Sequence, residues 1–443
     1  MSALARYFWG QHVKVAGYDK AATPLTGTLQ EMGIPVRFDD DAETAPKEVD
    51  LVVYTPAIPQ EHAQLQYYRQ NGYAVLKRSE VLELLSEGSF NICVAGTHGK
   101  TTISTMIAQI LRHTEYGCNA FLGGISSNYN TNFWSNERNI CVIEADEYDR
   151  SFLRLHPNIA VVSAIDADHL DIYGTEASLQ EAFIGFTQKL KPGGLLLTKF
   201  GLDRQRDMHA QRHLTYSLQN DAADVYGADI RMRRGGYEFD VVLKDKQLNR
   251  VVLQMGGMHN VENAVAAIAV ALELGIDAEK IRTAVREFKG VKRRFEYVAK
   301  TGHVTYIDDY AHHPEELKAL LTSARTLFEG QACTIIFQPH LYSRTKDFAD
   351  GFAESLDLAD HIILLPVYPA RELPMEGVNS ELIFDKMKNS NKSMMNKPDL
   401  LAYLEDQYLP SLSKENSGVL ITAGAGDIDA LVKPVKEMIE RLA

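Results

Sequence analysis

A short glycine-containing segment carries the residue types that bind phosphate. Residues 96–102 read Gly-Thr-His-Gly-Lys-Thr-Thr, between an apolar run at 92–95 and apolar residues at helical spacing from Ile103. This pattern predicts a buried strand, a tight turn and a helix that begins near Thr101. The N–H groups of such a turn and the positive end of the helix dipole attract phosphate oxygens. Lys100 can reach a terminal phosphate and the Thr101 hydroxyl can hold Mg2+, so the segment predicts an ATP site.

This segment departs from the general phosphate-loop pattern at one position, because Val94 stands where that pattern has a glycine. An ordinary strand–turn–helix corner with two glycines is the alternative. We expect residues 99–102 to be exposed between the strand and the helix, which favours the ATP site.

Polar residues follow two further apolar runs. Glu144 and Glu147 come just after the run at 140–143, and His169 comes after the run at 159–165. A carboxylate at a strand end beside a phosphate loop is a typical Mg2+ ligand, although alone it is more often a solvated loop residue. His169 is a candidate metal ligand or general base, with a structural loop histidine as the alternative. Its place at a strand end favours the metal ligand.

Two asparagines open an Ala-rich helix after Gly257. Asn260 and Asn263 are three residues apart, so they face the same way on the first helical turn. They can cap the helix or hydrogen-bond an adenine edge with their amides.

The last third of the chain carries polar clusters after three predicted strands, at 308–314, 338–340 and 424–427. Ligands of open α/β sheets lie outside the carboxyl ends of the strands, so these clusters predict a binding site. A metal site at His312 and His313 is an alternative, but adjacent histidines point apart and rarely converge on one ion.

The elements that would position these residues alternate between strand and helix, which predicts an α/β fold with parallel sheets. A chain of 443 residues is too long for one core, and we place domain limits at 1–88, 89–292 and 293–443. In the first domain we expect strands at 13–17 and 51–55 and a mainly helical segment at 61–85. We expect residues 386–400, rich in Lys, Asn and Ser, to form a surface excursion.

Composition excludes several classes of protein. The formal net charge of −13 argues against a nucleic-acid partner. The four cysteines are scattered, without metal spacing or a disulfide framework, which fits a reducing compartment. No apolar stretch reaches the length of a membrane span. These features predict a cytoplasmic protein.

Considered together, these motifs resemble those of the Mur ligases of peptidoglycan synthesis, over almost the whole chain and in the same order. The resemblance rests on segments 96–102, 144–147, 168–171, 259–263, 291–296, 309–314 and 338–345. It implies a Rossmann-like domain for a UDP-sugar, a central P-loop ATPase-type domain, and a Rossmann-like C-terminal domain that binds an amino acid and closes over ATP. It also implies an ATP-dependent ligase that adds L-alanine to the lactyl carboxylate of UDP-N-acetylmuramate through an acyl phosphate.

The resemblance assigns roles to the matching positions, with ATP and Mg2+ as cofactors and a monomer or homodimer as the assembly. Catalytic roles fall on Lys100, Glu144, His169, His313 and Arg344, of which the last two would face the amino acid. Metal roles fall on Thr101, Glu144 and His169. Nucleotide-binding roles fall on Gly96, Thr97, His98, Gly99, Lys100, Thr101, Thr102, Asn260, Asn263, Arg294 and Asp309.

Two departures from the family pattern affect these expectations. The family opens with a strand and a glycine-rich loop for the diphosphate, directly before a Met-Ser-Ala-Leu segment that here begins at Met1. We therefore expect a misplaced start or a truncated chain, with a loose first domain and weak UDP-sugar binding. Leu341 stands where many relatives have arginine, so part of the carboxylate clamp must come from elsewhere.

Three other functions remain as alternatives. The nearest is a ligase that joins a preformed tripeptide to the same sugar nucleotide in cell-wall recycling. A folylpolyglutamate-type ligase would share the ATPase core, and an inactive nucleotide-sensing module would share only the binding site. The presence of Lys100, Glu144 and His169 argues against inactivity.

Overall fold

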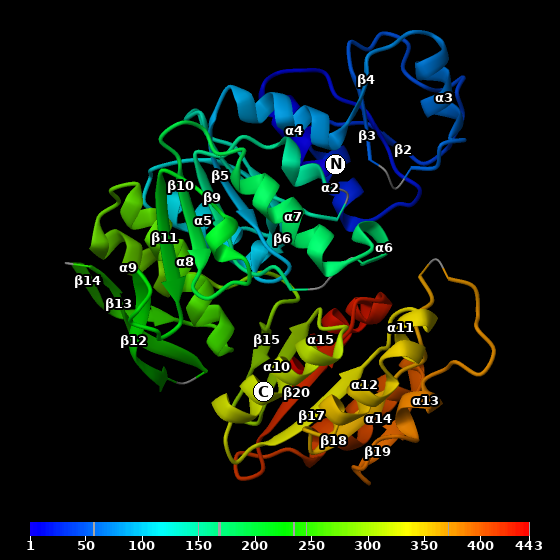
Figure 1. Cartoon of the computed structure of the whole chain (residues 1–443). Coiled ribbons are helices and arrows are strands. Elements are labelled where there is room, and N and C mark those ends of the chain that lie inside the picture. Colours follow the sequence, from blue (N-terminus) through cyan, green and yellow to red (C-terminus); the bar gives the residue numbers. More distant parts are fainter. Residues whose placement is uncertain are drawn as a thin grey trace.

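The computed structural model describes residues 1–443 apart from 56–57, 149, 167–169, 234, 245, 371 and 443, and apart from the side chains of residues 24, 170 and 171. The chain folds into an α/β structure with a first unit above a central domain and a C-terminal domain below it (Figure 1). No described helix is long and apolar enough to cross a membrane.

The first unit holds two separate two-stranded parallel sheets, β1-β2 and β3-β4. Its elements are α1 (Ser2–Gly10), β1 (Gly17–Tyr18), α2 (Pro24–Glu31), β2 (Val36–Arg37), β3 (Val52–Tyr54), α3 (Ala63–Gln70), β4 (Val75–Lys77) and α4 (Arg78–Glu87). Two expectations need correction here. The strand expected at 13–17 is reduced to β1, and β4 interrupts the segment expected to be mainly helical, because Val75 and Leu76 pair with β3.

The central domain is built on one ten-stranded sheet of order β14-β13-β12-β11-β10-β9-β5-β8-β6-β7. Its strands are β5 (Phe90–Ala95), β6 (Asn119–Ser126), β7 (Thr131–Trp134), β8 (Ile140–Glu144), β9 (Ile159–Val162), β10 (Leu195–Lys199), β11 (Arg212–Ser217), β12 (Val225–Arg233), β13 (Gly236–Leu243) and β14 (Lys246–Leu253). Its helices are α5 (Lys100–His113), α6 (Leu170–Tyr173), α7 (Glu176–Thr187), α8 (Met258–Glu273) and α9 (Ala278–Arg286).

The two sides of this sheet hold separate hydrophobic cores, because alternate residues of a buried strand point to opposite faces. Ile92 and Val94 pack with α5 and α8 on one side, whereas Cys93 and Ala95 pack with α7 on the other. The strand β5 is buried at the centre between β8 and β9. It therefore holds the phosphate-loop segment rigidly at its carboxyl end.

The C-terminal domain has a six-stranded sheet of order β15-β16-β20-β17-β18-β19. Its elements are β15 (Glu296–Lys300), β16 (Val304–Asp309), α10 (Pro314–Leu327), β17 (Ala332–Phe337), α11 (Tyr342–Asp347), α12 (Ala349–Leu356), β18 (His361–Leu364), α13 (Glu381–Phe384), β19 (Lys392–Met394), α14 (Lys397–Tyr403), β20 (Gly418–Ala423) and α15 (Val432–Arg441). The expectation of a surface excursion at residues 386–400 is wrong in part, because β19 pairs with β18 and extends the edge of the sheet.

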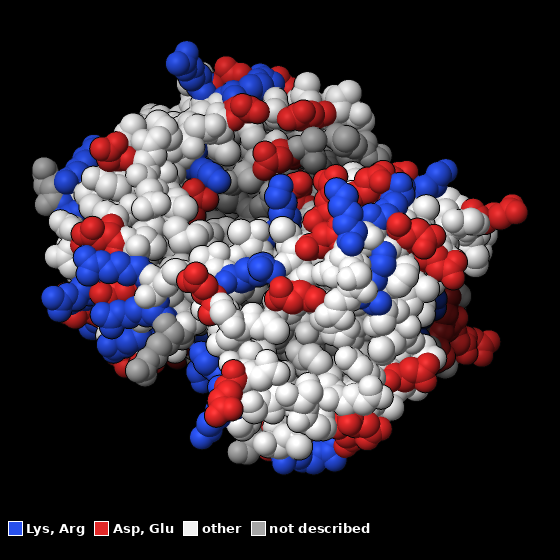
Figure 2. All heavy atoms as spheres, turned by 90° about the horizontal axis from the view of Figure 1, so that it is seen from below, with Lys and Arg blue, Asp and Glu red and all other residues white. Residues whose placement is uncertain are grey.

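Acidic and basic side chains are interspersed over the face of the molecule shown in Figure 2.

The four cysteines are buried and free, as their scattered positions predict.

Candidate functional site

The phosphate-loop segment connects β5 to α5 in a tight turn. Gly96 has φ +137° and Gly99 has φ +82°, which L side chains rarely adopt. A Cβ atom at Gly96 would clash with Ser163, and one at Gly99 would lie 2.8 Å from the Asn263 Oδ1 atom. The loop therefore packs closely against β9 and α8, and only glycine fits at these two positions.

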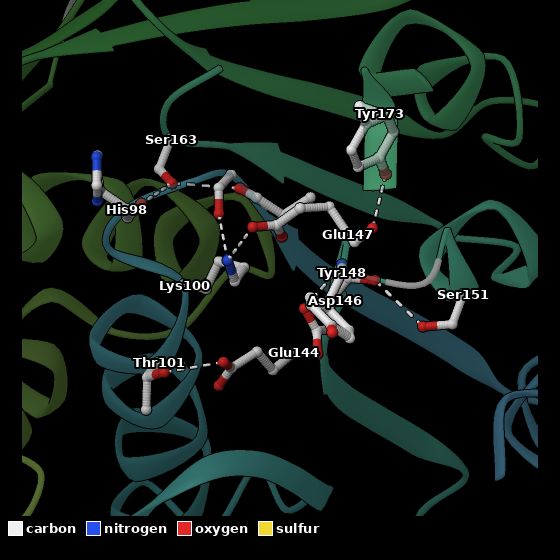
Figure 3. Close-up of polar contacts among 12 residues, drawn as sticks. His98, Lys100, Thr101, Glu144, Asp146, Glu147, Tyr148, Ser151, Ser163 and Tyr173 are labelled. Atoms are coloured by element: carbon white, nitrogen blue, oxygen red, sulfur yellow. Dashed lines mark hydrogen bonds and ion pairs between the residues drawn. The ribbon is translucent and has the colours of Figure 1, made fainter. Parts of the chain in front are cut away.

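Two side chains of the loop contact two carboxylates that follow β8 (Figure 3). The Lys100 Nζ atom donates hydrogen bonds to the Glu147 Oε1 atom at 2.7 Å and to the Gly96 carbonyl at 2.7 Å. The Thr101 hydroxyl donates to the Glu144 Oε1 atom at 2.8 Å. The structure thus brings together Thr101 and Glu144, two of the three predicted metal ligands, while Lys100 meets Glu147.

Lys100 is less accessible than we expected. Its side chain is 14% exposed and Glu147 is 0% exposed, so the expectation of an exposed loop lysine is wrong. Burial raises the pKa of the Glu147 carboxyl, and the Lys100 ammonium acts against that rise. Removing one partner of a buried ion pair leaves an uncompensated charge and typically costs about 3–5 kcal/mol.

The residues around Glu144 fit Mg2+ by their chemistry. The Glu144 carboxylate accepts hydrogen bonds from the Thr101 hydroxyl and from the Gly123 N–H at 2.8 Å, so hard oxygen ligands converge beside the loop. In the described part of the chain, no group of three or more His, Cys, Asp or Glu is arranged to hold a metal ion. His169, the third predicted ligand, lies outside the described residues.

The two asparagines of α8 are buried beside the phosphate loop. Asn260 donates to the Gly256 carbonyl at 2.7 Å, and Asn263 donates to the Asn260 Oδ1 atom at 3.2 Å. The residue that caps this helix is Gly257, and no side chain makes a capping hydrogen bond there. The alternative that these asparagines cap the helix is therefore wrong, and Asn263 instead contacts the loop at Gly99.

The nucleotide-binding residues predicted after α9 lie where the central domain meets the C-terminal domain. Asp309 is held at the end of β16, because its carboxylate accepts hydrogen bonds from the Phe295 N–H at 2.6 Å and the Ala311 N–H at 2.7 Å. The Arg294 guanidinium lies 5.3 Å from the centre of the Tyr310 ring. A cavity of about 400 Å³ lies nearby, between α8, β13 and α10.

The three polar clusters of the C-terminal domain meet at one edge of its sheet. The strands β16, β20 and β17 are parallel neighbours, so segments 308–314, 424–427 and 338–340 follow adjacent strand ends. Gln338 donates to the Asp427 Oδ1 atom at 2.9 Å, which connects two of the clusters. This topology brings the three clusters to one edge, and the binding site expected there stays a prediction.

The adjacent histidines of the first cluster diverge. His313 accepts from the Glu315 N–H at 3.4 Å to cap α10, and its ring packs on Phe348. His312 instead pairs with Glu316, with 3.2 Å between the His312 Nδ1 and Glu316 Oε2 atoms. This divergence removes the alternative of a metal site at the histidine pair.

His340 lies near both His312 and Arg344. The His312 and His340 ring centres are 6.1 Å apart, and burial, with the charges of His312 and Arg344, lowers the pKa of His340 to about 4. Leu341 begins α11 with φ +68°, and its N–H donates to the Tyr368 carbonyl at 2.9 Å.

Sequence reasoning assigned no role to Glu147 or Arg293. Glu147 was visible as the last acidic residue of segment 144–147, but nothing in the pattern said which carboxylate would meet Lys100. Arg293 connects the interdomain segment to the C-terminal sheet, with 3.2 Å between its Nε atom and the Asp308 Oδ2 atom and a further hydrogen bond to the Gly424 carbonyl. A doubled arginine was its only sequence signal.

Three family models match successive parts of the chain. The Mur ligase family, catalytic domain matches residues 1–89, the Mur ligase middle domain matches 94–271, and the Mur ligase, glutamate ligase domain matches 293–426. The chain belongs to the Mur ligase family, which makes it an ATP-dependent ligase that forms amide bonds. The resemblance drawn from the motifs and the predicted fold class of three α/β domains are both confirmed.

Within this family the chain is similar to enzymes that use L-alanine. The UDP-N-acetylmuramate–L-alanine ligase of Porphyromonas gingivalis strain W83 is 45% identical over 449 residues, which cover 100% of this chain and 97% of the relative. That of Cytophaga hutchinsonii is 44% identical and covers 100% of this chain and 95% of the relative. The crystal structure of the UDP-N-acetylmuramate–alanine ligase of Thermotoga maritima matches with a TM-score of 0.82 at 27% identity, over 100% of this chain and 96% of that one.

Proposed function

We propose that this chain joins L-alanine to the lactyl carboxylate of UDP-N-acetylmuramate in peptidoglycan synthesis, with ATP converted to ADP and phosphate. The observation that carries the proposal is the contact of the phosphate-loop residue Thr101, next to Lys100, with Glu144 at the end of β8, in a chain 45% identical over its whole length to an alanine ligase. The tripeptide-recycling alternative is less well supported, because a murein peptide ligase from Psychrobacter arcticus matches with a TM-score of 0.68 against 0.82 for the alanine ligase.

The phosphate loop would perform the first half of the reaction. A carboxylate is a poor acyl donor, and its phosphorylation supplies a leaving group for attack by the alanine amine. The loop N–H groups and the start of α5 would hold the ATP phosphates. Lys100 would neutralise charge on the transferring phosphoryl group. Asn260, Asn263, Arg294 and Asp309 would bind the rest of the nucleotide.

We place Mg2+ at Thr101 and Glu144, with His169 as a third ligand. The ion would neutralise phosphate charge when bound. In the structure the Thr101 hydroxyl and the Gly123 N–H fix the orientation of the Glu144 carboxylate. This fixed carboxylate supports the assignment because a preoriented ligand needs no rearrangement to bind.

The C-terminal domain would supply the groups that meet L-alanine. His313 follows β16 and Arg344 follows β17, the two strands on either side of β20, and both residues remain our candidates for contacts with the amino acid. We assign residues 1–88 to the UDP-sugar, 89–292 to ATP and 293–443 to the amino acid and to closure over the nucleotide. A cytoplasmic location and a monomer or homodimer complete the proposal.

Phosphate release tests the proposed activity. The full chain is given ATP, Mg2+ and UDP-N-acetylmuramate, and each amino acid is added singly. We expect release that depends on the sugar nucleotide and on L-alanine, with a product heavier by one alanine residue by mass spectrometry. Release that requires a tripeptide instead of L-alanine would overturn the proposal in favour of the recycling ligase.

Glu144→Gln tests the metal assignment, because it keeps the volume of the side chain and removes a charge that binds Mg2+. We expect turnover to collapse and to recover in part at high Mg2+. Glu137→Gln is the matched control, since it makes the same change at an exposed side chain before β8. Identical Mg2+ titrations of Glu144→Gln and the parent chain would exclude Glu144 as a ligand.

A further inference from the structure

The loop after β8 places two carboxylates in different surroundings, and only one of them is accounted for by metal binding. Glu144 faces Thr101, whereas Glu147 faces Lys100, as Figure 3 shows. The Glu147 side chain is 0% exposed. A fully buried carboxylate next to a nucleotide site is costly unless it has a role there, because its charge loses hydration and repels phosphate.

The backbone of Glu147 is fixed from two directions. Its carbonyl accepts a hydrogen bond from the Tyr173 hydroxyl at 2.6 Å and another from the Arg150 N–H at 2.9 Å. Tyr173 is itself 5% exposed at the end of α6. Glu147 is therefore held by the packed side of the sheet opposite α5, and its carboxylate reaches the loop from a rigid support.

Lys100 depends on this support for its position. Lysine has a flexible stem with four carbons, and its ammonium group can occupy many places around a loop. Here the Nζ atom is held between the Glu147 Oε1 atom and the Gly96 carbonyl, each at 2.7 Å. These two contacts hold the ammonium group beside the turn that begins at Gly96.

We propose that Glu147 is a positioning residue, whose buried carboxylate holds the Lys100 ammonium over the phosphate loop so that it meets the transferring phosphoryl group without rearrangement. This inference rests on the proposed function, because it needs Lys100 to act on ATP. A preorganised charge stabilises a transition state more than one that must first be oriented. Glu147 acts through Lys100 and does not touch the reacting atoms.

The proposal predicts a specific kinetic signature. Glu147→Gln should lower kcat by about 10–100-fold, since small displacements of a catalytic group are costly. It should leave the KM for ATP unchanged or lower, because a negative charge near the phosphates is removed. Glu137→Gln, with the same charge change on an exposed side chain before β8, should leave both constants unchanged.

A double-mutant cycle decides whether Glu147 acts through Lys100. In a Lys100→Ala background, Glu147→Gln should have no further effect on kcat, and it should raise the melting temperature because a buried charge that has lost the Lys100 ammonium is neutralised. The same fold-reduction of kcat in both backgrounds would overturn the proposal, as would a kcat of Glu147→Gln equal to that of the parent.

Two further measurements distinguish a folding defect, or a failure of the proposed function, from a failure of this proposal. Melting curves show whether Glu147→Gln folds, and if it does not, Glu147→Asp takes its place. The shorter carboxylate should retain part of the turnover, whereas full activity of Glu147→Asp would overturn the proposal. Failure of the proposed function would appear in the parent chain itself, as phosphate release that does not depend on L-alanine.

Discussion

The first unit and the central domain follow the same alternation of strand and helix but differ in how their strands are buried. In the central domain Val94, Val142 and Val161 lie on neighbouring strands of one sheet and are 0% exposed. In the described part of the first unit, β1 and β3 each pair on one side only, and its smallest core consists of Leu29, Ile34 and Val36. The alternation of strand and helix in the sequence predicts where strands form. A sheet is stable, however, only where its strands are buried on both faces and paired on both edges.

Exposed apolar side chains show the same difference. Val13 is 48% exposed, Phe38 is 38% exposed and Leu51 is 37% exposed, all beside the short strands of the first unit. The loose first domain expected from the sequence stays a prediction. The site residues of the phosphate loop instead follow β5, a strand that is buried from Asn91 to Ala95. Local stability should therefore differ strongly between the two regions.

Amide hydrogen exchange should show the largest difference between the first unit and the central domain. We expect backbone amides of β5 to exchange at least about 10³-fold more slowly than those of β1 and β3, because local opening needs far less free energy than opening the central core. Mass spectrometry of peptides from both regions measures this. Equal protection would show that the first unit is as stable as the central sheet.

Lys100→Ala should reduce turnover by about 10²–10³-fold, the usual cost of losing one donor to a transition state. It should also lower the melting temperature of the central domain, because Glu147 then loses the cation beside it. Lys189→Ala, at an exposed position after α7, is the matched control and should change neither. Near-normal turnover of Lys100→Ala would exclude the phosphate-loop assignment.

Matched leucine truncations sharpen the comparison. Leu197→Ala on β10 removes a side chain that is 0% exposed and should cost about 2–5 kcal/mol in the free energy of unfolding. Leu29→Ala on α2 removes a side chain from the small core of the first unit and should cost about 1–2 kcal/mol, because the thin core can collapse around the gap. Denaturant unfolding measures both. Equal losses would contradict the thin core inferred for the first unit.

Lowering the pH should give the smallest change in stability, through His340 at the edge of the C-terminal sheet. The folded pKa of His340 is about 4, below the ordinary value of 6.5, chiefly because of burial. The unfolded chain then binds more protons between these values, so stability is full above about pH 6.5 and falls as the pH drops toward 4. We expect a loss of about 1–2 kcal/mol at pH 5.

Melting curves from pH 7 to pH 4.5 test this. His340→Gln should flatten the pH dependence in that window, whereas His209→Gln at an exposed position should leave it unchanged. A His340→Gln curve parallel to that of the parent would remove His340 as the cause.

The sequence by itself determined the features that depend on local pattern. The strand–turn–helix of the phosphate loop, the acidic segment after β8 and the polar strand ends of the C-terminal domain follow from glycine positions and apolar periodicity. These signals lie within a few residues of one another, so no long-range packing is needed to predict them. The short strands β1, β4 and β19 were missed or misplaced because runs of two or three residues carry too little periodicity.

Only the tertiary structure decided which side chains meet. Glu144 and Glu147 are three residues apart in the same loop, yet one contacts Thr101 and the other Lys100. The choice depends on how the loop is held by α6 and by the strand order β9-β5-β8, which no local pattern specifies. The split sheet of the first unit has the same origin, since strand pairing joins residues far apart in the chain.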